Sequence, residues 1–394
     1  MTHTLIGLVG NHVEPLYELY HQYKPKNLVL FYSQNTQKPM QLLTNQLAKD
    51  GFKDVQTFSI QAFELNTITL QIAEKLAKFK LDELPPKEVV CDVTGGTKPM
   101  SIALFNYAKQ HNYNYTYVIG AIQQIDHSKD GLVPIEVKLS VKQFFGIKGI
   151  KIKESFLEVS QPSILSDYIF DTYLSIIKKA QNEFQKPAFL PEVRKRIYEK
   201  SSIIQDAGKA MGSNTDYNNW ALKNAKLALG KDLTMIFDKS QSLYRVKLAE
   251  ELDELWIVDE VITFLSGTWF EDYIFAKFAK TQLFDDLVMN LTTEYKSLNK
   301  IKKEELVKNE MDIVATKQGK LFLFEIKSGS GSFIGQDTIN KLHSLRLGVE
   351  DKLILISLYP LKPEMIEKAK EKHIYLICLL DDHLESKIQE LVNS

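Results

Sequence analysis

Short apolar runs alternate with helical patterns over residues 1–150. The apolar runs predict buried strands at Thr4–Val9, Leu28–Ser33, Val55–Ile60, Val89–Val93 and Tyr115–Gly120. Apolar residues at helical spacing predict helices between them, over Pro15–Tyr23, Pro39–Lys49, Thr69–Phe79 and Met100–Gln110. Strands that are apolar on both faces and alternate with helices are typical of a parallel sheet covered on both sides. We therefore expect an α/β domain with a doubly wound parallel sheet in residues 1–150.

The pattern changes in residues 151–255, where helical spacing dominates and the polar stretch GSNTDYNNW interrupts it. This segment is predicted to be a helical linker, and three or four short helices could also form a winged-helix-like module. A basic cluster at Arg194, Lys195 and Arg196 could contact phosphates. Because Glu192 and Glu199 flank it, a solvated helix face is the favoured interpretation.

Residues 256–394 form a second α/β pattern. It predicts helices over Trp269–Lys280 and Asp337–Gly348, and strands over Asn309–Thr316, Leu321–Lys327 and Lys352–Leu358. The first two strands are separated by little more than Gln318-Gly319, which only an antiparallel hairpin can connect. A mixed sheet follows.

Composition narrows the class of protein. Apolar residues make up 44% of the chain and charged residues 25%, as in ordinary folded proteins. The net charge of −1 gives almost no steering, so any nucleic-acid contact must come from local basic patches. Cys91 and Cys378 lie in apolar runs and are expected to be buried rather than bridged or metal-bound. No secretory pattern opens the chain and no apolar run nears the ~20 residues of a membrane span, so we expect a cytoplasmic protein without a membrane partner.

Charged residues end the strand Leu321–Lys327. Alternation along a strand places Glu325 and Lys327 on one face, at the end of a buried element. Asp312, on the other arm of the hairpin, comes to the same end and completes the pattern Asp-x12-Glu-x-Lys. Burying such charges costs several kcal/mol unless a partner such as a divalent metal compensates. The pattern therefore favours a metal site over a surface ion pair.

Each residue of this group can be given a role in phosphodiester hydrolysis. Asp312, Glu325 and the Ile326 carbonyl would hold Mg²⁺ or Mn²⁺, which lowers the pKa of bound water and neutralises developing charge. Lys327 would hold the attacking water or a non-bridging oxygen, and Glu271 is a further candidate ligand. Glu310, Gln336, Lys341 and Arg346 could assist or contact a phosphate backbone, but ordinary surface roles explain them equally well.

A glycine-rich loop, TGGTKPM, lies between the strand ending at Val93 and the next helix. Gly95 and Gly96 would let backbone N–H groups approach a ligand, and Thr94, Thr97 and Lys98 add hydroxyls and a cation. The helix start, with Pro99 near its first position, points its positive end at the loop. The chain has neither GxxxxGK[ST] nor GxGxxG, so the loop predicts an anion or nucleotide site other than an ATPase or dinucleotide site.

Two family resemblances rest on these motifs. Asp312, Glu325 and Lys327, with the helix, hairpin and strand around them, resemble the PD-(D/E)XK nucleases and imply a restriction-endonuclease-like domain. CDVTGGTKPM after an apolar strand resembles the CARF domains, Rossmann-like folds of CRISPR systems that bind cyclic oligoadenylates. That second resemblance implies ligand contacts from Thr94–Lys98 and Met100 and, by position alone, from the loops after the first two strands: Gly10, Asn11, His12, Ser33, Gln34 and Asn35.

Together the resemblances imply a sensor domain (1–150), a linker (151–255) and a nuclease domain (256–394). The expected protein is a homodimer that binds a cyclic oligoadenylate, foremost cyclic tetra-adenylate, and then cuts DNA, RNA or both in type III CRISPR antiviral defence. A ligand-responsive winged-helix regulator with an idle nuclease domain would instead bind duplexes with a steep salt dependence and cleave nothing. An unregulated restriction or repair nuclease would keep the chemistry but bind no nucleotide. The intact Asp312, Glu325 and Lys327 set favours an active nuclease.

Overall fold

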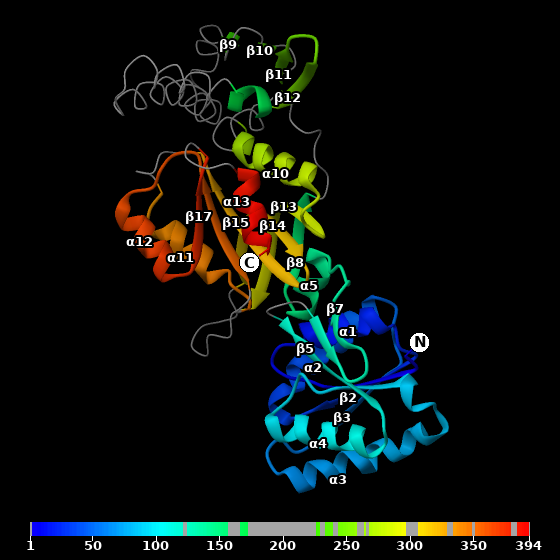
Figure 1. Cartoon of the computed structure of the whole chain (residues 1–394). Helices are drawn as coiled ribbons and strands as arrows, with labels where there is room; N and C mark the ends of the chain where they lie inside the picture. The colour runs from blue at the N-terminus through cyan, green and yellow to red at the C-terminus, as the bar shows by residue number, and fades with distance from the viewer. Residues whose placement is uncertain are drawn as a thin grey trace. The chain divides into compact units, whose positions relative to one another are not determined.

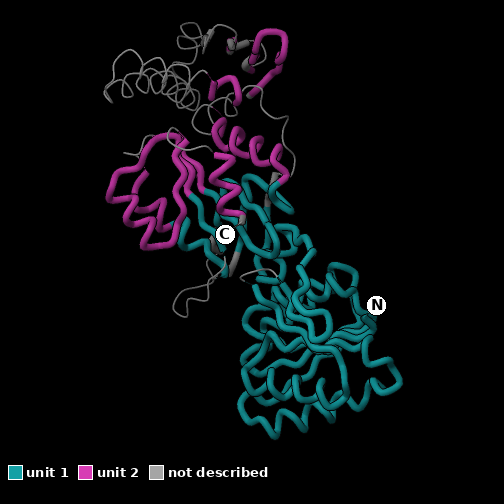
Figure 2. Tube along the Cα trace, viewed as in Figure 1, with its two compact units in different colours: residues 1–156, 283–324, 341–354 teal, residues 157–282, 325–340, 355–394 magenta. Residues whose placement is uncertain are grey.

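The computed structural model describes residues 2–120, 124–156, 166–171, 226–228, 233–238, 243–257, 264, 268–296, 306–328, 334–348, 351–379 and 384–393. These residues divide into two compact units (Figure 2). One comprises residues 1–156, 283–324 and 341–354, and the other comprises 157–282, 325–340 and 355–394.

The N-terminal region is built on a seven-stranded sheet with the order β3-β2-β1-β4-β5-β6-β7 (Figure 1). Its parallel strands are β1 (Thr4–Leu8), β2 (Asn27–Tyr32), β3 (Val55–Ser59), β4 (Val89–Asp92) and β5 (Asn114–Ile119). The predicted parallel sheet is thereby confirmed. An antiparallel hairpin, β6 (Gln124–His127) and β7 (Gly131–Pro134), extends the sheet beyond β5 and was not predicted.

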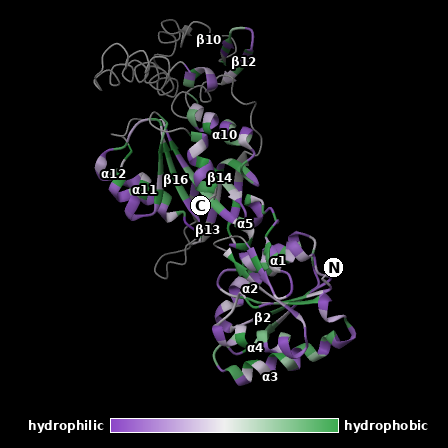
Figure 3. Ribbon diagram, viewed as in Figure 1, coloured by the Kyte–Doolittle hydropathy of each residue, from purple (hydrophilic) through white to green (hydrophobic). Residues whose placement is uncertain are grey.

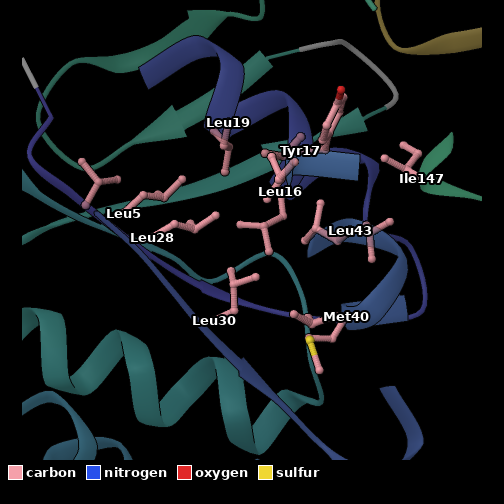
Figure 4. Close-up of a cluster of buried hydrophobic side chains, with 14 of the residues drawn as sticks. Leu5, Leu16, Tyr17, Leu19, Leu28, Leu30, Met40, Leu43 and Ile147 are labelled. Carbon is pink, nitrogen blue, oxygen red and sulfur yellow. The ribbon is translucent and has the colours of Figure 1, made fainter. Parts of the chain in front are cut away.

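Helices cover this sheet, the first four of them near the positions predicted from apolar spacing and the last one not predicted. They are α1 (Glu14–Tyr23), α2 (Gln37–Lys49), α3 (Leu65–Leu76), α4 (Lys98–Gln110) and the short α5 (Val141–Ile147). Neighbouring residues of β1 serve different cores, because strand side chains alternate between faces. Leu5 packs with Leu16 and Leu43 from α1 and α2 (Figure 4), whereas Ile6 packs in the cluster that contains Ile68 and Leu104 from α3 and α4.

A second, six-stranded sheet has the order β17-β16-β15-β14-β13-β8. Its strands are β8 (Lys151–Phe156), β13 (Asp286–Lys296), β14 (Leu306–Lys317), β15 (Lys320–Lys327), β16 (Lys352–Ser357) and β17 (Ile374–Cys378). The predicted hairpin is confirmed, since β14 and β15 pair antiparallel around Gln318 and Gly319. Both turn residues have positive φ, 48° and 68°, as a tight two-residue hairpin turn requires. Central strands of the two sheets, such as β2 and β16, are mostly hydrophobic (Figure 3).

The C-terminal helices are α10 (Trp269–Thr281), α11 (Gln336–Ser344), α12 (Pro363–Glu371) and α13 (Leu384–Asn393). The predicted helices beginning at Trp269 and Asp337 are confirmed, and α10 packs against α13. Within the described part of the chain, no helix is long and apolar enough to cross a membrane.

Strands occupy much of the described part of the middle segment. β8 joins the second sheet by pairing with β13. β9 (Lys226–Ala228), β10 (Leu233–Asp238), β11 (Leu243–Leu248) and β12 (Leu252–Ile257) form an antiparallel sheet, while residues 166–171 are helical. The basic cluster at Arg194, Lys195 and Arg196, like most of the predicted helices, lies outside the described residues.

Candidate functional site

The carboxyl end of β15 carries two of the predicted catalytic residues. Glu325 is buried, with only 2% of its surface exposed, and the Lys327 side chain is partly exposed. The Lys327 ammonium lies 2.8 Å from the Glu325 Oε1 and donates to the Ile326 carbonyl oxygen at 3.1 Å. The Lys327 ammonium therefore contacts two of the three groups that were predicted to bind a metal, Glu325 and the Ile326 carbonyl. The carboxylate and the carbonyl converge on one position, which is what a divalent ion needs from them.

Asp312 lies on β14 and is also buried. The last registered pair of the β14–β15 ladder at this end joins Ile313 to Phe324. Asp312 directly precedes Ile313 in sequence, and Glu325 directly follows Phe324. The hairpin therefore carries the two acidic residues one position beyond its last registered pair.

Asn290 of β13 is an irregularity that the sequence did not reveal. It stands between the registered pairs Met289–Ile313 and Leu291–Met311, across from Asp312. Its φ of 51° lies in the left-handed region, which asparagine tolerates better than most residues. An Asn inside a long strand is the only sequence signal that could have indicated it.

Glu271 lies in the first turn of α10, beside Asp272. Burial raises the pKa of the Asp272 carboxyl to about 6. Among the described residues, no three His, Cys, Asp or Glu side chains gather as a group that could hold a metal. The metal-binding roles of Asp312, Glu325, the Ile326 carbonyl and Glu271 stay predictions.

The glycine-rich loop lies at the switch point of the seven-stranded sheet. β1 lies between β2 and β4, so the chain runs from β1 to β2 on one side and from β4 to β5 on the other. Ligands of open parallel sheets bind at the point where the chain leaves two neighbouring strands in opposite directions. A Cβ on Gly95 would overlap the Leu8 carbonyl oxygen, and one on Gly10 would lie 3.3 Å from the Gly96 nitrogen. Gly96 also needs its positive φ of 76°. The predicted loops at Gly10 and Gly95 are thus in close contact because both lack side chains.

The threonine hydroxyls of this loop form hydrogen bonds to other groups of the protein. The Thr94 hydroxyl donates to the Asp92 Oδ1 and accepts from the Val118 N–H at 2.8 Å. The Thr97 hydroxyl donates to the Ala62 carbonyl, and the Ser101 hydroxyl donates to the Gly95 carbonyl at 3.0 Å. These hydroxyls therefore fix the shape of the loop, rather than being held ready only for a ligand as the sequence suggested.

Asp92 anchors this arrangement and was missed in the sequence. Burial raises the pKa of its carboxyl to about 6, although the Thr94 hydroxyl and amide hydrogen bonds act in the opposite direction. Among the described residues its Oδ2 has no hydrogen-bond partner. An aspartate that ends a buried strand directly before a glycine loop was the available signal.

The N-terminus of α4 completes the loop. Thr97 is the N-cap residue with extended φ and ψ of −87° and 161°, and its side chain makes no capping hydrogen bond. The first amides of α4 therefore point into the loop without a side-chain cap, where the helix dipole favours an anion. Lys98 is exposed beside them. Met100 is fully buried, and its Cβ and Cε would lie 3.3 Å from a Cβ on Gly96.

The other predicted ligand loops follow β1 and β2. Asn11, His12, Gln34 and Asn35 are exposed, whereas Ser33 is buried and its N–H donates to the Thr36 hydroxyl at 3.0 Å. Because β1, β2 and β4 run parallel, all of these loops emerge at one edge of the sheet. The exposed polar side chains of these loops therefore lie at the same edge of the sheet.

Two family models match separate parts of the chain. Residues 14–144 match the family model of the Card1 CARF domain, and residues 258–393 match that of the Card1-like endonuclease domain. No curated protein matched the sequence.

Solved structures resemble the fold over nearly the whole chain. Can2 from Sulfobacillus thermosulfidooxidans, in complex with cyclic tetra-adenylate, has a TM-score of 0.66 at 18% identity, covering 99% of this chain and 97% of its own. Protein VC1899 from Vibrio cholerae has a TM-score of 0.72 at 15% identity, with the same coverage of 99% and 97%. A type III CRISPR defence DNA nuclease activated by cyclic oligoadenylate has a TM-score of 0.53 at 12% identity, covering 92% of this chain and 46% of its own. At these identities the likeness concerns the fold alone.

Proposed function

We propose that this chain, in which a CARF domain of the Card1 type precedes a Card1-like endonuclease domain, is a metal-dependent nuclease activated by cyclic oligoadenylate in type III CRISPR defence. The observation that carries the proposal is the pairing of two sites in one chain. One is a glycine loop at the switch point of a parallel sheet, and the other is a hairpin that carries Asp312, Glu325 and Lys327.

The activator is proposed to be cyclic tetra-adenylate, the ligand of the similarly folded Can2. Its phosphates would accept hydrogen bonds from the amides of Gly95, Gly96 and the start of α4, with Lys98 supplying a positive charge. The loops after β1 and β2 would contact the bases through Asn11, His12, Gln34 and Asn35. The internal hydrogen bonds of Thr94 and Thr97 hold this surface in shape before the ligand arrives, which lowers the entropic cost of binding.

A homodimer is proposed because a cyclic ligand presents the same groups repeatedly to symmetry-related surfaces. Support comes from exposed apolar side chains near the glycine loop. Phe63, next to the Ala62 carbonyl that binds Thr97, is 72% exposed, and Ile102, one turn into α4, is 48% exposed. Such side chains are costly to leave in water and are common at subunit interfaces.

The nuclease chemistry is assigned to the end of β15 and its neighbour β14. Asp312, Glu325 and the Ile326 carbonyl would hold Mg²⁺ or Mn²⁺, and the ion would activate water and stabilise charge on the phosphate. Lys327, already in contact with Glu325 and Ile326, would hold the attacking water or a phosphate oxygen. Glu271 is proposed as a further ligand, and DNA, RNA or both as substrates.

One assay tests the proposal. The full chain is incubated with Mn²⁺ and with plasmid, single-stranded DNA or RNA, in the presence or absence of each cyclic oligoadenylate. We expect cleavage only when a cyclic oligoadenylate ring, called the ring below, is present. We expect no cleavage by Glu325→Ala. Ring-independent cleavage would indicate an unregulated nuclease, and salt-sensitive duplex binding without cleavage would indicate a regulator with an idle nuclease domain.

A further inference from the structure

The segment Leu139–Ile147 is joined by hydrogen bonds to β13 and to β14, the strand that carries Asp312. The Val141 N–H donates to the Asp286 Oδ2 at 2.7 Å, and the buried Thr316 hydroxyl donates to the Leu139 carbonyl. Asp286 and Thr316 are registered partners on β13 and β14. Two facing residues of β13 and β14 therefore bind the same short segment, and α5 lies against both strands.

Helix α5 also packs against helix α2, which covers the seven-stranded sheet. Its backbone approaches so closely that a Cβ on Gly146 would collide with the Gln46 side chain. The Tyr17 hydroxyl donates to Asp50 at the end of α2, and the Gln46 amide donates to the same carboxylate at 3.0 Å. Ile147 and Leu43 share one buried cluster (Figure 4). Shifting α2 would therefore require α5 to move or these contacts to break.

Helix α2 continues directly from a proposed ligand loop. Ser33 directly follows β2. Residues Gln34–Thr36 then form a single helical turn, and α2 begins at Gln37. At the other end of the route, Asp312 lies four residues before Thr316 on β14, a separation of about 13 Å at ~3.3 Å per residue. A continuous set of packed elements thus connects the loop to a proposed metal ligand.

An ion pair at the end of α5 joins this helix to α1. The ammonium of Lys148, the C-cap residue of α5, pairs with Glu14 of α1, and both side chains are largely buried. Burial raises the pKa of Asp351, in the turn before β16, while the Gly348 and Leu347 amides and the Lys148 ammonium lower it. Lys148 is therefore within electrostatic reach of α1 and of that turn.

We propose that α5 transmits ligand binding from the loops after β1 and β2 to the strands β13 and β14, and that Asp286 and Thr316 are the positioning residues that couple these strands to α5. This inference rests on the function proposed above. A ring that displaces the Ser33–Thr36 loop would move α2, α2 would move α5, and the two hydrogen bonds would carry the shift into β13 and β14. Coupling of this kind requires an element with two arrangements that both sites bias.

The test separates coupling from binding and from chemistry. The double variant Asp286→Ala/Thr316→Val removes both hydrogen bonds to the segment Leu139–Val141 and leaves every proposed ligand and catalytic residue in place. Cleavage rates with Mn²⁺ are measured with and without cyclic tetra-adenylate, and the dissociation constant of the ring is measured by calorimetry. We expect an unchanged rate without the ring and an unchanged dissociation constant, with stimulation by the ring reduced roughly tenfold or more.

Two comparisons exclude a merely structural effect. Asp286→Asn/Thr316→Ser keeps a hydrogen-bond acceptor and a hydroxyl at these positions, so stimulation of cleavage by the ring should be retained. Asp285, which directly precedes β13, accepts hydrogen bonds from the Lys317 ammonium at 3.2 Å and from the Gln318 N–H at 2.7 Å. It therefore links the start of β13 to the turn between β14 and β15. Asp285→Ala should lower the unfolding temperature but retain stimulation. If the double variant fails to fold, Thr316→Val alone serves in its place.

The possible failures are distinguishable. A wild-type protein that no ring stimulates overturns the proposed function and the inference with it. A stimulated wild type together with full stimulation of the double variant overturns the inference alone. Equal loss of stimulation in Asp285→Ala would also overturn it, because hairpin stability and not the link to α5 would then be responsible.

Discussion

The Lys327 ammonium lies 2.8 Å from the Glu325 carboxylate and also contacts the Ile326 carbonyl. A buried carboxylate needs a nearby positive charge, and here the lysine supplies it from the same strand. Binding of a divalent ion at these oxygens would compete with this contact and release the ammonium toward the substrate. The arrangement therefore predicts that Lys327 has opposite effects on metal binding and on catalysis.

Lys327→Ala should lower kcat by about 10²- to 10³-fold, as removal of a group that stabilises transition-state charge does. It should also leave Glu325 with less compensation, so Mn²⁺ should raise the unfolding temperature of the variant more than that of the wild type. Thermal unfolding with and without Mn²⁺, alongside cleavage rates, checks both effects. Lys317→Ala is the matched control, because Lys317 pairs with Asp285 instead. An identical Mn²⁺ shift in wild type and Lys327→Ala would contradict the prediction.

Gly95→Ala should damage the ligand loop, because the added Cβ would overlap the Leu8 carbonyl oxygen. Overpacking of this kind typically costs about 1–3 kcal/mol, and here the loop itself must give way. We expect at least a tenfold loss of affinity for cyclic tetra-adenylate, measured by calorimetry. Gly120→Ala provides the control, since a Cβ at that position meets nothing within 4 Å. Equal affinities of the two variants would show that the close approach to Leu8 is unimportant for binding.

Glu18 should make the protein less stable as the pH rises. Burial, and then the charge of Glu14, raise the pKa of its carboxyl to about 8 from the usual 4.5. A group with a raised folded-state pKa contributes stability that is complete below pH 4.5 and is lost as the pH rises through 8. Relative to Glu18→Gln, the wild type should lose about 1.4 kcal/mol of unfolding free energy per pH unit within this window.

Denaturant unfolding at several pH values measures this difference directly. Glu74→Gln serves as the control, because the Glu74 side chain is mostly exposed and forms only a surface pair with Lys75. A difference between wild type and Glu18→Gln that is constant from pH 5 to pH 8 would show that Glu18 titrates normally.

Asn290 should be replaceable by glycine but not by alanine. Its φ of 51° costs L residues with a Cβ about 1–2 kcal/mol, a cost that glycine avoids. We expect Asn290→Ala to lower the free energy of unfolding and to weaken Mn²⁺ binding, because Asp312 stands directly across from it. Denaturant unfolding and Mn²⁺ calorimetry test this. If Asn290→Ala were as stable as Asn290→Gly, the strand would have to accommodate a regular residue there.

Much of the fold followed from local pattern. The strands from Thr4 to Ile119 and the hairpin at Gln318 and Gly319 agree with their predicted positions to within a few residues. Apolar runs and glycine turns specify these elements through near neighbours in sequence, so the chain's own periodicity was sufficient. β13 and β8 were missed because each is a strand only by virtue of its partner on the second sheet.

The sequence by itself determined which chemical groups are present: a glycine loop before a helix, and an Asp, a Glu and a Lys on neighbouring strands. Only the tertiary structure decided how they are used. Hydrogen bonds from the Val118 N–H to Thr94 and from Thr97 to Ala62 join residues 24 and 35 positions apart, so loop residues expected to face a ligand also hold the loop together. The contacts of Asp286 and Thr316 with the segment at Leu139 span 145 and 177 residues of sequence. No local pattern encodes such contacts, because they arise only when distant elements pack.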